Sequence, residues 1–292
     1  MEKIYLKARA KINLGLNVLN KREDKYHNIK SVFQKINLYD EILIEKNAIN
    51  EFELKTNIKK INNKENIIYK AYLIIKEKHN NITGIRVILN KKIPMEAGLG
   101  GGSTDCACFI KGINKLFDLN LSKTEMEAIG RKLGADVVPC FYDKAVLAEG
   151  IGDKITVIDT NVKYYIVIVK PNISCNTKEM YMKIDQRKNV AEIDLSDEII
   201  KGLQQSNIEI IASNLYNSFE SIQKDNQLMQ NIKKDLIKEG ALGSLMTGSG
   251  SCIYGIFKDK QRAKSAFNNF KNKYQTFICT SYNSKRSEYF DW

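Results

Sequence analysis

The sequence predicts an α+β fold in two domains, with a boundary near residue 155. The chain has 292 residues, and single cores stop growing efficiently at roughly 250 to 300 residues. Strand-like and helix-like stretches alternate without a regular βαβ rhythm, which is typical of α+β proteins. The pattern also restarts after residue 155 with a new apolar strand. We therefore expect one domain over residues 1–155 and a second over residues 156–292.

The first half is predicted as a sheet with helices packed on it. Alternating apolar residues predict strands at residues 4–18, in two runs within 40–54, and at 84–89. Residues 66–78 carry apolar side chains at helical spacing, which predicts a helix that packs on the sheet. Two further helices are expected over 103–117 and 122–133. Ser122 and Glu125 begin the last helix with the spacing of a capping box.

The second half mixes the two kinds of element. Strands are predicted at 164–169, 243–246 and 253–257. Helices are predicted at 177–184, 208–220, 227–239 and 260–274. Pro171 follows the first strand and ends it, because proline has no N–H for the next position of the ladder.

The charge of the chain suggests a solvated lysine-rich surface. The net charge is +12, but only seven of the 46 basic residues are arginine, the usual choice for contacts with bases and phosphates. The lysines are spread along the whole chain. We therefore expect a field that attracts a polyanionic small molecule, and no nucleic-acid partner.

Cysteine spacing and hydropathy exclude several other classes of protein. The six cysteines show no CxxC pair of the kind that builds a zinc site, and we interpret them as reduced thiols, mostly in the core. The longest apolar runs are far shorter than the roughly 20 residues that cross a bilayer. The N-terminal residues lack the continuous apolar segment of a secretory signal. A cytoplasmic protein without a membrane partner is expected.

One glycine-rich segment has the pattern of a phosphate-binding loop. Four glycines within residues 98–102 follow a predicted strand and open a predicted helix. Such a loop turns backbone N–H groups toward an anion at the positive end of the helix dipole. Ser103 and Thr104 add hydroxyls for a phosphate or a magnesium ion. The segment 94–105 therefore predicts a phosphate-binding site.

Two better-known phosphate loops do not match this segment. A Walker loop needs a lysine before its Ser or Thr, whereas Gly102 leads directly into Ser103. A dinucleotide fingerprint counted from Gly98 needs glycine at position 103. A flexible linker stays open as an alternative, although linkers are seldom placed so tightly between an apolar strand and a helix.

Residues 94–104 resemble the ATP-binding signature of the GHMP kinases. Residues 7–19 and 245–252 are also similar to segments of that superfamily, so the resemblance extends over nearly the whole chain. It implies a two-domain fold, with an N-terminal domain like that of a ribosomal protein and a C-terminal ferredoxin-like α/β sandwich. It also implies transfer of phosphate from ATP, with Mg²⁺, to a hydroxyl of a small molecule.

Within the superfamily, the chain resembles the kinases that phosphorylate the 2-hydroxyl of a cytidine diphosphate-linked methylerythritol in the non-mevalonate isoprenoid pathway. The matching segments are 10–14, 24–27, 133–137, 148–152 and 177–181. The Gly-Glu-His triplet expected in mevalonate and galactose kinases is missing. Three positions depart from the pattern: Lys25 stands for a usual glycine, Val138 for a usual proline, and Ser218 for a usual acidic residue.

The resemblance implies catalytic roles for two residues. Asp136 is the expected general base for the substrate hydroxyl, and Lys11 is expected beside it, where it keeps the carboxylate ionised and offsets charge on the migrating phosphoryl group. From the pattern alone, a second interpretation is equally good: Asp136 is a turn residue after a helix, and Lys11 is a solvent-exposed lysine on a strand. Asn13 lies on the same strand face as Lys11 and is expected to hydrogen-bond the substrate polyol.

The remaining site residues are assigned in the same way. Tyr26 and His27 resemble a cytosine pocket, with Tyr181 as the opposite stacking wall. The nucleotide-binding set is Pro94, Met95, Glu96, Ala97, Gly98, Leu99, Gly100, Gly101, Gly102, Ser103, Thr104 and Asn66. The sequence does not fix the metal ligands, for which Ser103, Thr104 and Glu149 are candidates.

Several alternatives stay open at this point. Lys91 and Lys92 fit either phosphate contacts or a solvated strand end. The glycine-rich residues 240–251 fit either a segment that closes the site or a set of tight turns. For the whole protein, the alternatives to a kinase are a nucleic-acid-binding module and a catalytically silent ATP sensor. A monomer and a homodimer are both compatible with the sequence.

Overall fold

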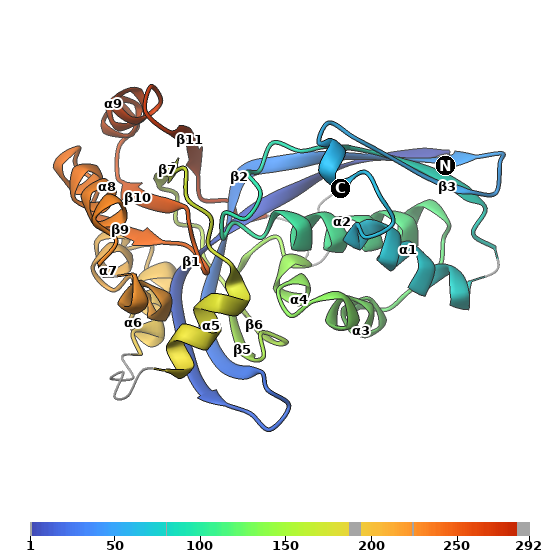
Figure 1. Cartoon of the computed structure of the whole chain (residues 1–292), viewed down its shortest axis with the longest axis horizontal. Helices are drawn as coiled ribbons and strands as arrows, with labels where there is room; N and C mark the ends of the chain where they lie inside the picture. Colours follow the sequence, from blue (N-terminus) through green and yellow to red (C-terminus); the bar gives the residue numbers. More distant parts are fainter. Residues whose placement is uncertain (1, 80, 187–193, 224, 285–292) are drawn as a thin grey trace.

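The structure is a computed structural model that describes residues 2–79, 81–186, 194–223 and 225–284. Two β-sheets lie side by side, and helices cover their outer faces (Figure 1). The strands β1 (Lys3–Lys21) and β2 (His27–Asn47) are the longest, and they run from one half of the molecule into the other. The predicted α+β class is confirmed.

The first sheet contains seven strands. Besides β1 and β2 they are β3 (Phe52–Thr56), β4 (Gly84–Asn90), β5 (Ala145–Gly150), β6 (Lys154–Ile158) and β8 (Tyr216–Asn217). The order is β3-β4-β2-β1-β8, with β5 paired to β2 and β6 to β5. The pairs β3–β4 and β1–β8 are parallel and the others antiparallel. Although β8 comes late in the chain, it therefore extends the sheet of the first half.

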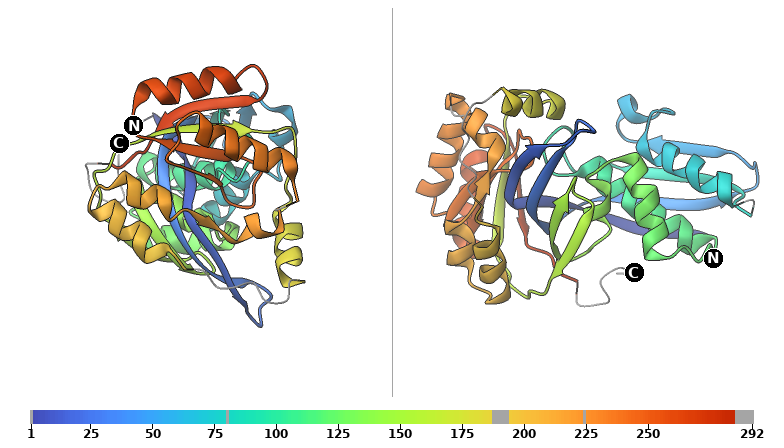
Figure 2. Two further views of the ribbon diagram at one scale, coloured as in Figure 1. Left: turned by 90° about the vertical axis from the view of Figure 1, so that its left-hand side faces the viewer. Right: turned by 90° about the horizontal axis from the view of Figure 1, so that it is seen from below.

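Four helices cover one face of this sheet (Figure 2). They are α1 (Ile67–Lys78), α2 (Gly101–Leu116), α3 (Lys123–Leu133) and α4 (Val137–Cys140). Helix α2 packs directly on β1 and β2, and its buried face includes Phe109 and Ile113. The predicted capping box of Ser122 and Glu125 is present at the start of α3.

The second sheet is antiparallel and has the order β11-β7-β10-β9. Its strands are β7 (Tyr165–Lys170), β9 (Gly243–Met246), β10 (Ile253–Phe257) and β11 (Gln275–Thr280). Ile166 and Ile168 of β7 face the first sheet, whereas Val167 and Val169 face α8 (Gln227–Lys238) and α9 (Lys260–Phe270). Because side chains alternate along a strand and both faces are buried, β7 is a continuous apolar run.

The remaining helices lie where the two halves meet. Helices α6 (Ser196–Gln204) and α7 (Ile208–Ser213) pack near the contact between the two sheets, and α5 (Thr177–Asp185) borders the first half (Figure 1). Two short 3₁₀ helices, η1 (Lys59–Ile61) and η2 (Ser218–Ile222), complete the set in the described residues.

Two of the predicted elements differ from the structure by more than five residues. The predicted helix 208–220 ends at Ser213, where Asn214 donates its amide to the carbonyl of Ile210, and the chain then forms β8 and η2. Strand β2 begins thirteen residues before the predicted 40, since 40 − 27 = 13. Its first part was missed because polar Ser31, Gln34 and Lys35 are buried there and break the apolar alternation.

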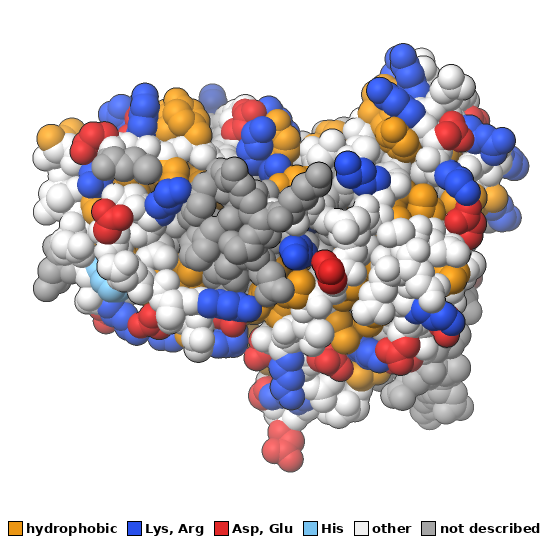
Figure 3. Space-filling model, turned by 180° about the vertical axis from the view of Figure 1, so that it is seen from behind, with side chains coloured by type: hydrophobic (Ala, Val, Ile, Leu, Met, Phe, Trp, Pro, Cys, Tyr) orange, Lys and Arg blue, Asp and Glu red, His pale blue; other side chains and the backbone are white. Residues whose placement is uncertain are grey.

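Charged side chains of both signs are interspersed on the face drawn in Figure 3, where lysine and arginine form no single patch among the coloured residues. This distribution agrees with the expected solvated surface. No helix in the part of the chain that the structure describes has the length and hydropathy needed to span a membrane.

Candidate active site

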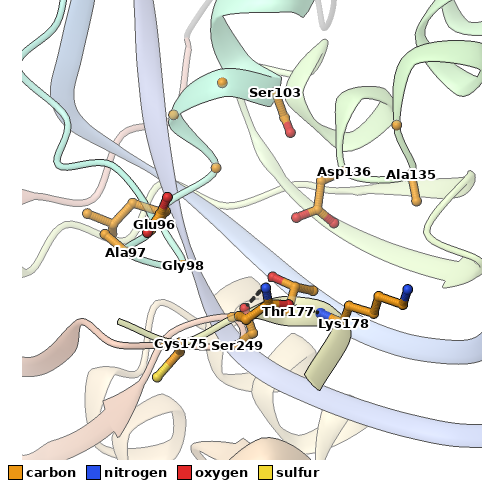
Figure 4. Close-up of a pocket in the computed structure, with 18 of the residues that line it drawn as sticks. Glu96, Ala97, Gly98, Ser103, Ala135, Asp136, Cys175, Thr177, Lys178 and Ser249 are labelled. Atoms are coloured by element: carbon orange, nitrogen blue, oxygen red, sulfur yellow. Dashed lines mark hydrogen bonds between the residues drawn. The ribbon is translucent and has the colours of Figure 1, made fainter. Parts of the chain in front are cut away.

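A cavity of about 1270 Å³ lies between the two halves of the molecule. Single small-ligand sites are typically about 300–1,000 Å³, so this cavity has room for two ligands. The glycine-rich loop forms one wall, and the start of α5 with the turn after β9 forms another (Figure 4). The predicted residues that line it are Pro94, Met95, Glu96, Ala97, Gly98, Leu99, Gly100, Gly101, Gly102, Ser103, Asn66, Lys11, Asp136, Tyr26, His27 and Tyr181.

The glycine-rich loop is held from both halves. Its Gly98 has a φ of +72°, and a Cβ placed there would lie 2.0 Å from the carbonyl oxygen of Thr247, so only glycine fits. The N–H of Lys11 donates to the carbonyl of Leu99 at 3.0 Å, and the N–H of Cys252 donates to that of Ala97 at 3.3 Å. The turn after β9 therefore closes on the loop, as one of the two interpretations of residues 240–251 expected.

Helix α2 presents its N-terminus to the cavity. Gly100 is the N-cap residue, with a φ of +69°, and no side chain caps the helix. A Cβ at Gly102 would have no atom within 4 Å, so the first turn opens toward free space. Ser103 points its hydroxyl toward the same space (Figure 4). Uncapped N–H groups at the positive end of a 16-residue helix suit an anion.

A network of buried charged side chains anchors the start of the glycine-rich loop to β2 and α2. The ammonium of Lys91 lies between the carboxylates of Asp40 and Asp105, 2.6 Å from Asp105, and Asp40 also accepts from the N–H of Ile93 at 2.8 Å. Burial alone would lower the pKa of Lys91, but the two carboxylates raise it. The ammonium is thus committed to this network. Exposed Lys92 pairs with Glu41, so both lysines are engaged by carboxylates, although Lys91 also lines the cavity.

A register shift aims Lys11 at the loop. The pairing between β1 and β2 shifts between Arg9 and Lys11. Before the shift Ala8 packs under the helices, and after it Ala10 packs against the second sheet. Lys11, the next residue, consequently turns to the helix side of the sheet. Bulges that re-aim a side chain next to an active site are common.

Lys11 and Asp136 meet in the cavity. Their Nζ and Oδ2 atoms are 4.0 Å apart, and the side chain of Lys11 is 4% exposed while that of Asp136 is 51% exposed. Asp136 precedes α4 and makes no capping bond there. Its carboxylate points into the cavity, and the hydroxyl of Ser103 is directed toward it (Figure 4). Burial lowers the pKa of Lys11, and the nearby Asp136 opposes that effect.

Asn13 lies behind the cavity wall and does not line it. Its Oδ1 accepts from the ammonium of Lys11 at 2.8 Å and from the N–H of Gly248 at 3.0 Å, and its amide donates to Ser31 at 2.8 Å. With its amide engaged in this way, Asn13 orients Lys11 and ties β1 to the turn after β9. The predicted contact between Asn13 and the substrate polyol stays a prediction.

The residues of the predicted base pocket line the same cavity. The rings of His27 and Tyr181 stack with centroids 5.0 Å apart and planes inclined by 22°. Phe219 supports Tyr181 edge-on, also at 5.0 Å. Tyr26 lies on the rim and is 57% exposed. These residues therefore bring aromatic faces and one buried imidazole to the cavity, and their role as a base pocket stays a prediction.

One functional residue was missed in the sequence. Asp185 accepts a hydrogen bond from Nε2 of His27, with the two atoms 2.6 Å apart. It lies four residues after Tyr181, which itself lies four residues after Thr177, whose hydroxyl bonds to Ser249 at 2.8 Å. Residues four apart share one face of a helix. This spacing was visible in the sequence and identifies the face of α5 that borders the cavity.

Three residues predicted to contact the nucleotide or the metal either hydrogen-bond to other parts of the protein or do not line the cavity. The hydroxyl of Thr104 donates to the carbonyl of Arg9 at 2.7 Å and accepts from Lys35 at 3.1 Å, and neither Thr104 nor Glu149 lines the cavity. Asn66 does line it, but its side chain caps α1 and donates to the carbonyl of Ile61. Ser103 is therefore the candidate metal ligand that the geometry retains.

The departure at Lys25 has a structural explanation. Lys25 closes the turn between β1 and β2 with a φ of +69°, in the left-handed region that glycine adopts without cost. The turn is held by the N–H of Lys25 donating to the carbonyl of Arg22 at 3.1 Å. The loop thus keeps the conformation that a glycine would take, and Tyr26 and His27 stay in place.

The other two departures are accommodated within the fold. Val138 is buried in α4, and the hydroxyl of Ser218 accepts a hydrogen bond from the N–H of Val18.

Comparison with known proteins places these features in a family. The family model for the GHMP kinase N-terminal domain matches residues 66–144, and the model for the GHMP kinase C-terminal domain matches residues 199–276. A protein of Lachnospira eligens named 4-diphosphocytidyl-2-C-methyl-D-erythritol kinase is 41% identical over 89% of this chain and 91% of its own. A protein of the same name from Alkaliphilus metalliredigens is 36% identical over 98% and 99%.

Solved structures show the same fold. A crystal structure of 4-(cytidine 5'-diphospho)-2C-methyl-D-erythritol kinase superposes with a TM-score of 0.82 at 25% identity, over 96% of this chain and all of the other. The homoserine kinase of Cytophaga hutchinsonii superposes with a TM-score of 0.77 at 18% identity, over 96% and 95%. The second likeness concerns the fold alone.

Proposed function

The chain belongs to the GHMP kinases and, within them, to the family of 4-diphosphocytidyl-2-C-methyl-D-erythritol kinases, and from this premise we propose its reaction and the roles of its residues. The reaction is transfer of the γ-phosphoryl group of ATP to the 2-hydroxyl of 4-diphosphocytidyl-2-C-methyl-D-erythritol, a step of the non-mevalonate isoprenoid pathway. The observation that carries the proposal is that Lys11, Asp136, the glycine-rich loop and the His27 pocket all line one cavity.

Asp136 acts as the base on the substrate hydroxyl. Its carboxylate is half-exposed and points into the cavity, so it is free to approach a hydroxyl within hydrogen-bond reach. Lys11 lies 4.0 Å away, and its positive charge favours the ionised carboxylate and the charge that spreads over the transferring phosphoryl oxygens. Asn13 holds the ammonium in this position.

ATP binds with its phosphates at the N-terminus of α2. The uncapped first turn and the open space at Gly102 support this placement, because backbone N–H groups there face an anion. Mg²⁺ neutralises phosphate charge when bound. The described residues contain no group of three acidic, histidine or cysteine side chains that would hold a metal. Ser103 would therefore fit an ion bound mainly by nucleotide oxygens and water.

The cytidine diphosphate part of the substrate binds at the opposite end. Tyr181 and Tyr26 supply aromatic faces for the base, and His27 supplies a polar ring. Lys21, Lys25 and Lys178 also line the cavity. Their charges suit the diphosphate.

Measurement of ADP release with a panel of acceptors tests the proposal. The purified protein should release ADP with 4-diphosphocytidyl-2-C-methyl-D-erythritol, and at least about 100-fold more slowly with mevalonate, homoserine or galactose. A preference for one of the other acceptors would contradict the substrate while leaving the kinase intact. ATP binding without ADP release from any acceptor would support a silent sensor instead.

A further inference from the structure

We propose that Asp185 sets the nucleobase specificity of the cavity by fixing which nitrogen of His27 carries the proton. The inference rests on the proposed function, because it requires the base of the substrate to meet His27. Asp185 is a positioning residue here, since it acts through the imidazole ring. Its last-turn position on α5 places it between the two halves of the molecule.

Both oxygens of Asp185 are engaged by donors from the β1–β2 hairpin. Oδ1 lies 2.6 Å from Nε2 of His27, and Oδ2 pairs with the ammonium of Lys21. Partial burial would raise the pKa of Asp185, but the hydrogen bonds from Lys21 and His27 hold that pKa below its usual value. An ionised carboxylate only accepts hydrogen bonds, so Nε2 of His27 must carry a proton.

Protonation at Nε2 determines what Nδ1 offers to a ligand. A neutral imidazole has one N–H, and its other nitrogen is an acceptor. Within the described residues, Nδ1 of His27 has no hydrogen-bond partner, and His27 lines the cavity although only 7% of it is exposed. The ring therefore presents an acceptor to the base.

An acceptor at this position distinguishes cytosine from uracil. Cytosine carries an amino group at N4, which donates, whereas the pyrimidine that has a carbonyl at the same position only accepts there. The lone pair of Nδ1 binds the cytosine amino group and repels the uracil carbonyl oxygen. One well-placed polar contact of this kind discriminates between bases by about 10- to 100-fold.

Tyr181 is oriented to support the same contact. Its ring plane is inclined by only 22° to that of His27. A base that lies in the imidazole plane to reach Nδ1 is therefore nearly parallel to the tyrosine ring and can stack on it. Tyr181 and Asp185 are one helical turn apart on α5, so a single helix face supplies both the stacking surface and the group that fixes the proton.

The test compares two substrates that differ only in the base: the cytidine diphosphate-linked methylerythritol and its uridine diphosphate-linked counterpart. In Asp185→Asn, the ammonium of Lys21 can only donate and will attract the amide oxygen, which leaves the amide NH₂ facing Nε2. The ring must then accept at Nε2 and carry its proton at Nδ1. The cytidine-over-uridine ratio of kcat/KM should fall at least about tenfold through the KM of the cytidyl substrate, with an unchanged KM for ATP.

Asp194→Asn is the matched control. The carboxylate of Asp194 also pairs with a lysine of the same hairpin, Lys30, but makes no contact with His27 in the described structure. It should keep the wild-type ratio. A second measurement does not depend on turnover: in ¹⁵N-labelled wild-type protein, which has only two histidines, the signals of His27 should show a proton on Nε2 and none on Nδ1. His79→Gln assigns the signals.

The outcomes separate the two proposals. Rapid wild-type turnover of both substrates with similar kcat/KM overturns the role of Asp185 and leaves the kinase function standing. A proton on Nδ1 of His27, or on both nitrogens, at pH 8 also overturns it. The absence of ADP release from the cytidyl substrate contradicts the proposed function and, with it, this inference.

Discussion

At the scale of single residues, the site works through buried polar side chains that hold one another. Asn13 shows how such contacts add to an expected role. The sequence placed it beside Lys11 on one strand face, and the structure agrees, but its amide is occupied by Lys11, Ser31 and Gly248. Spacing along a strand predicts the direction of a side chain. It does not predict which partners from distant segments will use its hydrogen bonds, here a turn 235 residues away.

The environment of Lys11 predicts a pH dependence. Burial lowers its pKa, so its charge is lost at lower pH than that of an ordinary lysine, and kcat/KM should fall on the alkaline side at correspondingly lower pH. Lys11→Arg keeps its charge over the whole accessible range. The residual rate of ADP release by this variant should therefore no longer fall as the pH rises. If the activity of the wild type and of Lys11→Arg falls over the same alkaline range, the loss of charge on Lys11 is not the cause of that fall.

At the scale of elements, most long periodic patterns were predicted, but α6, β5, β6 and β11 were not. The helix 66–78 and the capping box of α3 followed from local signals and are confirmed. The first part of β2 was missed because its buried polar residues contact other segments, as when Gln34 donates to the carbonyl of Tyr282. The register shift that aims Lys11 depends on the pairing of β1 with β2. Such tertiary contacts leave no periodic signal in a single sequence.

Two glycines of the loop should respond differently to alanine. Gly98→Ala places a Cβ against the carbonyl of Thr247 at a positive φ, so the free energy of unfolding should fall by more than about 1 kcal/mol. Gly102→Ala meets no atom within 4 Å and should leave stability unchanged or raise it by up to about 1 kcal/mol. Chemical denaturation measures both.

ATP binding should show a different pattern for the second variant. The methyl group of Gly102→Ala enters the open space at the start of α2, so the KM for ATP should rise about tenfold although the protein stays stable. If Gly102→Ala binds ATP normally, the phosphates lie elsewhere. If Gly98→Ala is as stable as wild type, the close contact between the loop and the turn after β9 does not exist in solution.

At the scale of the whole molecule, the cavity needs both halves. Strand β8 joins the first sheet, and the turn after β9 closes on the glycine-rich loop. The sequence predicted the fold class, and most of the predicted site residues line the cavity, because the motifs are local. It could not place the contribution of α5, since the pairing of Asp185 with His27 joins residues 158 apart in the chain. A boundary between domains near residue 155 stays a prediction.

The central claim is that Lys11 and Asp136 act together on one phosphoryl transfer, and a double-mutant cycle tests it most directly. Single-turnover rates would be measured for Lys11→Met, Asp136→Asn and the double variant, with ATP binding checked in each. Each single change should slow transfer by at least about 100-fold, and the double variant should be little slower than the slower single variant, because the two groups serve one step. Rate losses that multiply, or a single variant with wild-type transfer, would contradict the claim.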